Sequence, residues 1–336
     1  MLIYVSANSN KEIFLIPPYP MSSAFNKKLP NLLRHLFLYR AAALLALAGG
    51  ITFAQDNNPA TRGLGDNDEQ YAECFKKADY HLGRFEFEES LKDCQAALNF
   101  KPNDFLIRAM MCLDYYEIGE KLDVRKRDEK EKKIVIYETM VKIANEGISA
   151  APDKGECYFM RGLANARMAT TKGIFSELFS AKQIENDWLV SVDRKSDYTT
   201  PNGENLQASS CVALGVYYRL CPTFFMLRWV FGISGDLDKA VFYCRKAYEL
   251  DPTRIEIVKE YGVALITRGL DRKNQEDIDL GKKFLQMVPM LPLRLQTDKV
   301  DIAHSKMLLN DISLCPGYSR DEEQDISEDS YQKMNE

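Results

Sequence analysis

Apolar residues recur at helical spacing along most of the chain, and three stretches of it end in the same way. Residues 95–102, 145–152 and 245–252 each carry a small residue five places before a proline. A small residue lets two helices approach closely, and a proline ends one helix so that the next can begin. The pattern predicts pairs of helices that repeat along the chain.

The register of this pattern continues across each proline. Counting onward at a period of about 34 residues places glycines where helices must pack or turn. These are Gly119, Gly162, Gly262 and Gly269. The most regular copy spans residues 235–247 and is closed by Pro252. Its small residues, like those of the other copies, resemble the tetratricopeptide (TPR) repeat family.

The resemblance implies an all-α fold, a TPR-like α-α superhelix that is a solenoid of helical hairpins. Roughly four hairpins and additional terminal helices are expected. A charged run at 120–133 predicts a solvated helix extension. A polar stretch at 199–205, with Pro201 and Gly203, predicts a loop. The remaining helices are expected at residues 173–192, 211–220, 255–268, 277–288 and 298–314.

The beginning of the chain has the pattern of an export signal. A basic stretch with Lys27 and Arg34 precedes an apolar run at 41–53, and small residues stand at Thr52 and Ala54. This run is shorter than the roughly 20 residues that span a bilayer, so no stable membrane span is expected after cleavage. We predict export to the periplasm; an uncleaved N-terminal anchor is the less favoured alternative.

The expected organisation has five parts. They are a possible misassigned start at 1–20, a signal peptide at 21–54, a linker at 55–68, a repeat domain at 69–315 and an acidic disordered tail at 316–336.

Composition and charge exclude several classes of function. With 49 acidic and 44 basic residues spread along the chain, the net charge of −5 provides no basic field for nucleic acid. The three histidines are far apart in sequence. No hydrolase, zinc or phosphate-loop motif is present. The sequence therefore predicts a protein that is not an enzyme, with no catalytic residue, no metal and no cofactor.

The eight cysteines form no C-x-x-C pair, and most of them stand among apolar residues. We expect buried free thiols. If a disulfide exists, Cys74 with Cys94 is the candidate, since the two would face each other across one hairpin.

Candidate binding residues follow from the resemblance, because first-helix side chains line the concave face in the TPR family. The positions transferred are Ala109, Leu113, Tyr116, Phe159, Leu163, Arg167, Val263, Ile266 and Thr267. Tyr116, Phe159, Arg167 and Ile266 are the predicted partner-binding groove residues. The alternative is that the apolar ones pack against an added helix or a neighbouring repeat.

The most unusual segment is an aromatic insertion at 221–232, which contains Phe224, Phe225, Trp229 and Phe231. A comparable insertion marks a looser resemblance to regulator-of-microtubule-dynamics-like TPR proteins. The T-component proteins of TRAP transporters are a further loose resemblance. Such an apolar run is either packed as a helix in the core or used as a partner patch, a wall of an apolar-ligand pocket or a shallow membrane contact.

Two functions follow from these observations. The leading one is an exported, non-catalytic scaffold that holds a protein or peptide partner in the cell envelope. The alternative is a periplasmic binding protein for a small apolar ligand, associated with a transport system. A scaffold predicts an open groove with a polar and aromatic lining, whereas a ligand carrier predicts an enclosed apolar cavity near Trp229.

Overall fold

The computed structural model describes residues 64–173, 178–196, 198–223, 228 and 232–320. The chain divides into two units, Met1–Thr61 and Arg62–Glu336, and every described residue belongs to the second. The predicted start, signal peptide and most of the linker therefore lie outside the described residues. The last linker residues do not: they form the first turn of a helix that begins at Leu64.

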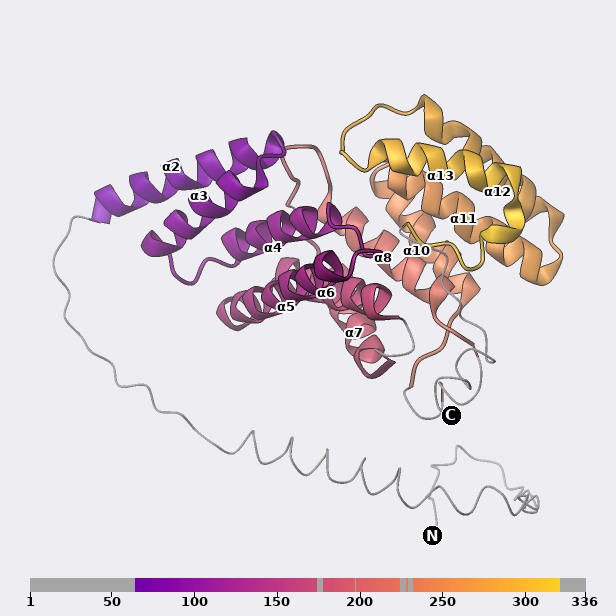
Figure 1. Ribbon diagram of the computed structural model, residues 1–336, viewed down its shortest axis with the longest axis horizontal. Coiled ribbons are helices and arrows are strands. Elements are labelled where there is room, and N and C mark those ends of the chain that lie inside the picture. Colours follow the sequence, from indigo (N-terminus) through magenta and orange to yellow (C-terminus); the bar gives the residue numbers. More distant parts are fainter. Residues whose placement is uncertain (1–63, 174–177, 197, 224–227, 229–231, 321–336) are drawn as a thin grey trace, which may run out of the picture. The chain divides into compact units, whose positions relative to one another are not determined.

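The described chain is all-α (Figure 1). Its α-helices are α2 (Leu64–Gly83), α3 (Phe87–Phe100), α4 (Phe105–Glu120), α5 (Arg127–Ala150), α6 (Glu156–Lys172), α7 (Leu178–Arg194), α8 (Leu206–Leu220), α10 (Leu237–Leu250), α11 (Ile255–Arg272), α12 (Gln275–Met287) and α13 (Asp298–Asn310). Two short 3-10 helices follow α12 and α13, namely η2 (Val288–Met290) and η3 (Ile312–Leu314). Within the described ranges, β-structure is limited to one isolated bridge between Thr199 and Asn205.

Successive helices pack as hairpins, and the hairpins stack on one another. The pairs are α2 with α3, α4 with α5, α6 with α7, α8 with α10, and α11 with α12. The first helices of successive hairpins also touch, since α6 contacts both α4 and α8, and α8 contacts α11. This arrangement is a TPR-like α-α superhelix, as the sequence predicted (Figure 1).

The prolines and glycines stand at the helix ends and helix contacts that the repeat pattern predicted. Helices α3, α5 and α10 each end two residues before their proline, at Phe100, Ala150 and Leu250. A Cβ atom added at Gly162 would lie 2.5 Å from Trp188 Nε1, and one at Gly269 would lie 2.7 Å from Ile278 Cγ1. Both distances are shorter than van der Waals contact, so only glycine allows these neighbouring helices to approach so closely.

Two expectations are corrected. The helix predicted from residue 173 does not include that residue, because Gly173 has φ 107° and is the C-cap of α6; α7 is described from Leu178. The charged run at 120–133 is not a purely solvated extension. Glu120 ends α4, and Lys133 on α5 lies 3.4 Å from its carboxylate with both side chains buried. The rest of this run forms a turn and the exposed first part of α5.

The tail predicted at 316–336 is structured at its start. Arg219 on α8 donates hydrogen bonds to the carbonyls of Cys315, at 3.0 Å, and Tyr318, at 2.8 Å. Tyr318 is 3% exposed. Residues 316–320 are therefore part of the folded unit, because their carbonyls satisfy a buried guanidinium and their aromatic ring fills the core. Residues 321–336 lie outside the described part.

All eight cysteines are free thiols, and seven of them are buried. The expectation of buried thiols is confirmed, and the Cys74–Cys94 bridge is not formed. No helix among the described residues is long and apolar enough to cross a bilayer.

Candidate functional site

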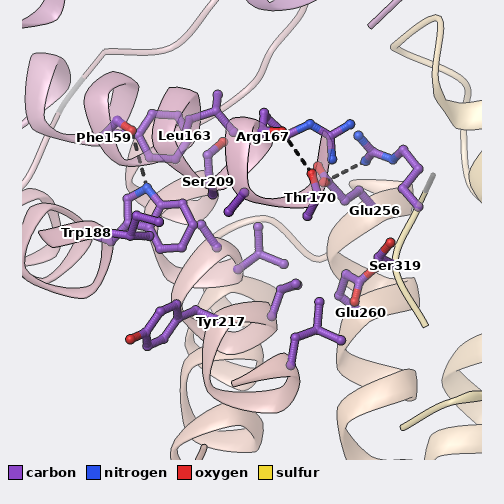
Figure 2. A pocket seen from close by; sticks show the side chains of 18 of the residues that line it. Phe159, Leu163, Arg167, Thr170, Trp188, Ser209, Tyr217, Glu256, Glu260 and Ser319 are labelled. Atoms are coloured by element: carbon purple, nitrogen blue, oxygen red, sulfur yellow. Dashed lines mark hydrogen bonds and ion pairs between the residues drawn. The ribbon is translucent and has the colours of Figure 1, made fainter. Parts of the chain in front are cut away.

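A cavity of about 230 Å³ lies where the first helices of the hairpins meet. Its walls come from α4, α6, α7, α8 and α11, from the loop before α8 and from the C-terminal segment. Most of the wall is apolar, and charged side chains gather in one region of it. Figure 2 shows Phe159, Leu163 and Trp188 at one side, with Glu256 and Ser319 at the other.

The apolar wall is built from helical spacing. Ile184 and Trp188 are four residues apart on α7, and Val212 and Val216 are four apart on α8, so each pair shares one face of its helix. Trp188 Nε1 donates to the carbonyl of Phe159 at 3.3 Å, which fixes the indole ring against the cavity (Figure 2). The absence of a side chain at Gly162 is what leaves room for this ring.

The polar end is centred on Arg254 at the start of α11. Its guanidinium donates to Ser209 Oγ at 2.5 Å and lies 2.6 Å from Glu204 and 2.8 Å from Glu256. The loop with the Thr199–Asn205 bridge supplies Glu204. Burial raises the pKa of Glu204, and Arg254 opposes this shift. The Arg254 side chain is 8% exposed, so this cation lies inside the wall of the cavity.

Arg320 closes the same end from the C-terminal segment. Its guanidinium lies 2.6 Å from Glu256 and 3.2 Å from Asp301, and it donates to Tyr116 Oη at 3.3 Å. These three partners belong to α11, α13 and α4. One side chain thus connects the first hairpins to the last, beside the cavity.

A second ionic cluster supports α4 and α6 behind Tyr116. Glu120 accepts hydrogen bonds from Arg167 and from Tyr137 Oη, the latter at 2.5 Å, and Lys133 lies 3.4 Å away. Burial alone would raise the pKa of Glu120, but the Arg167 and Lys133 cations outweigh it and lower the pKa to about 2. One turn earlier, burial raises the pKa of Glu117 to about 8.

The structure brings three of the four predicted groove residues to this cavity. Tyr116, Phe159 and Arg167 line it, together with Leu113 and Leu163 from the same helix positions. Ile266 does not line it, and its placement in a groove is corrected. It is fully buried against Leu285 and Leu308 of the terminal helices, which is the packing alternative. Val263 lies in the same cluster.

The predicted apolar patch of Phe224, Phe225, Trp229 and Phe231 lies outside the described residues. The residues on either side of it are described, and Cys221, Pro222 and Ile233 line the cavity.

Sequence reasoning missed Trp188, Arg254 and Arg320. Trp188 lies on α7, whose sequence does not follow the repeat pattern. Arg254 directly precedes α11, and only apolar packing residues of that helix were predicted to be candidates. Arg320 was assigned to the tail. No local signal in the sequence marks Arg320, because it stands between Ser319 and Asp321 at the start of an acidic stretch.

The described residues contain no group of three or more histidine, cysteine, aspartate or glutamate side chains placed to hold a metal ion. Every carboxylate at the polar end faces an arginine or lysine instead.

No family model matches the chain, and no curated protein matches its sequence. Among solved structures, the crystal structure of MamA protein is similar over 68% of this chain and 98% of that chain. The identity is 13% and the TM-score is 0.39.

Proposed function

We propose that this protein binds a small, largely apolar molecule in the cavity between α6, α7, α8 and α11. The observation that carries the proposal is the apolar lining of a recess of about 230 Å³, to which α4, α6, α7, α8 and α11 contribute. An apolar pocket with a few convergent polar groups is the usual form of a small-molecule site. The apolar lining favours the ligand-binding alternative over the polar and aromatic groove expected of a peptide scaffold.

The volume of the cavity limits the size of the ligand. An engineered apolar cavity of about 150 Å³ takes up benzene. A space of about 230 Å³ holds an apolar body somewhat larger than that. The ligand we propose is therefore a small molecule, and a long peptide would have to bind elsewhere.

Binding of the neutral, environment-sensitive dye N-phenyl-1-naphthylamine tests the proposal. We expect saturable fluorescence enhancement by the purified protein and its loss in the Val216→Phe variant, because the added ring fills the cavity. The matched control is Val135→Phe, since Val135 is 59% exposed on α5. Equal binding by both variants would place the dye outside the cavity and contradict the proposal.

A protein partner is the second candidate, and the outer face of α13 favours it. Val300 and Met307 are seven residues apart on this helix and remain 44% and 43% exposed. Met290, on the preceding connection, is 74% exposed. Exposed apolar side chains on one helix face are typical of protein contacts. A co-purifying subunit that dissociates in the Met307→Glu variant would support this candidate.

Export to the periplasm is a further part of the proposal. It is supported by the basic and apolar pattern of residues 21–54. Cell fractionation of the full-length chain tests it: a periplasmic product shortened near Gln55 is expected, and a full-length cytoplasmic product would contradict it.

A further inference from the structure

The charged end of the cavity indicates which head group the ligand carries. We propose that the cavity binds an amphipathic organic acid, with its carboxylate held between Arg254 and Arg320 and its apolar body against Trp188. This inference rests on the proposed function, because it names the chemical class of the ligand for the same cavity.

The protein's own Glu256 shows that a carboxylate fits at this position. One of its oxygens lies 2.8 Å from Arg254 Nη2 and the other lies 2.6 Å from Arg320 Nη2. Two guanidiniums that face one carboxylate make the planar, multidentate contact that arginine forms best. Glu256 is also the most exposed of the three side chains, at 23% against 8% and 14%, so it is the member of the group nearest to free solvent.

Arg254 retains an unused donor. Its Nη atoms bind Ser209, Glu204 and Glu256, whereas its buried Nε has no acceptor among the described residues. A buried donor without a partner is rare in folded proteins and is often satisfied by a ligand. An oxygen of an added carboxylate would supply the missing acceptor.

The ion pairs around Arg254 and Arg320 form one connected group of four cations and four carboxylates among the described residues. The cations are Arg219, Arg254, Lys259 and Arg320; the carboxylates are Glu204, Glu256, Glu260 and Asp301. Because this group is balanced, a bound carboxylate would compete with Glu256 for the two arginines. An amine head group would face the Arg254 and Arg320 guanidiniums, whereas a carboxylate accepts hydrogen bonds from both.

The apolar part of the ligand is short. The cavity volume of about 230 Å³ accommodates a body of roughly six to ten carbon atoms, judged from the benzene-sized engineered cavity. Hexanoate, octanoate and decanoate span this range and are the probes we would use.

Calorimetric titration of the wild-type protein with octanoate, 1-octanol and octylamine tests the head group with the chain length held constant. We expect octanoate to bind at least about tenfold more tightly than the other two, because only it gains charge-assisted hydrogen bonds. Equal affinity for octanoate and 1-octanol would overturn the inference and leave the proposed function standing. Tighter binding of octyl phosphate than of octanoate would overturn the assignment of a carboxylate.

The Glu256→Gln variant tests the position. Removing the internal carboxylate leaves Arg254 and Arg320 without their shared anion, so octanoate should bind several-fold more tightly while 1-octanol is unchanged. The control is Glu249→Gln, which removes an exposed carboxylate that faces Arg245 on α10, and it should change neither affinity. Unchanged octanoate binding in a folded Glu256→Gln protein contradicts the assignment. Absence of binding by all three acids and by the neutral dye contradicts the proposed function as well.

Discussion

At the scale of single residues, the least expected feature is the number of charges inside a repeat protein. The resemblance to the TPR family predicted Tyr116, Phe159 and Arg167 on the inner face, and they line the cavity. The resemblance could not show that Arg167 reaches Glu120, which lies 47 residues earlier in the chain. Pairing between helices depends on how hairpins stack, and one local sequence window does not contain that information. From the sequence alone, a charged residue in a helix is therefore predicted to be exposed to solvent, even where the fold buries it beside an ion-pair partner.

Asp114 gives a prediction at this scale. It is fully buried on α4, its Oδ2 lies 2.8 Å from Ser90 Oγ, and its Oδ1 has no hydrogen-bond partner. Burial raises its pKa from 3.8 to about 8. The folded protein keeps a proton that the unfolded chain releases, so this stabilisation is complete below about pH 4 and is lost as pH rises toward 8.

The Asp114→Asn variant cannot titrate at this position. Its free energy of unfolding should fall less steeply between about pH 5 and 8, by up to about 1.4 kcal/mol per pH unit. Urea unfolding across this range measures the slope. The exposed Asp153, changed to asparagine, is the control and should leave the slope unchanged. Parallel pH profiles for wild type and Asp114→Asn would show that Asp114 is ionised in the folded state.

At the scale of helices, the glycine and proline register predicted the hairpins correctly because both residue types act through local geometry. Proline breaks a helix at any position beyond its first turn, and a missing Cβ allows two helices to approach closely. The boundaries around α7 and the start of the tail were not predictable in this way. There the chain departs from the repeat, and the packing is decided by segments as distant as Arg219 and Tyr318.

Gly162→Ala tests the contact between α6 and α7. The new Cβ would meet the Trp188 ring at 2.5 Å, so the indole must move toward the cavity. We expect a loss of about 1–3 kcal/mol in the free energy of unfolding, together with weaker binding of the neutral dye. Lys132→Ala, on the exposed face of α5, should change neither. Wild-type stability and dye binding in Gly162→Ala would show that the two helices are more loosely packed than described.

At the scale of the whole folded unit, Arg320 joins segments that the repeat pattern treats as independent. A solenoid is stabilised mainly by contacts between neighbouring repeats. Arg320 adds a direct connection between Tyr116 on α4 and Asp301 on α13. This connection could not be predicted from the sequence, because Arg320 stands at the start of an acidic tail.

Arg320→Met should lower the free energy of unfolding by about 3–5 kcal/mol, because it leaves Glu256 and Asp301 buried with fewer cations. The control is Arg127→Met, whose pair with Glu131 is 93% and 65% exposed and should contribute less than about 1 kcal/mol. Urea unfolding measures both. Equal effects of the two substitutions would mean that Arg320 does not close the unit.

Native mass spectrometry of the protein from Gln55 onward, purified gently from its own host, tests the central claim most directly. We predict that a bound small lipophilic molecule, a carboxylic acid if the inferred head group is correct, adds its mass to the wild-type protein and to Val135→Phe. The same mass should be absent from Val216→Phe. A co-purifying protein subunit in all three samples, with no small molecule in any of them, would contradict the claim and favour the scaffold.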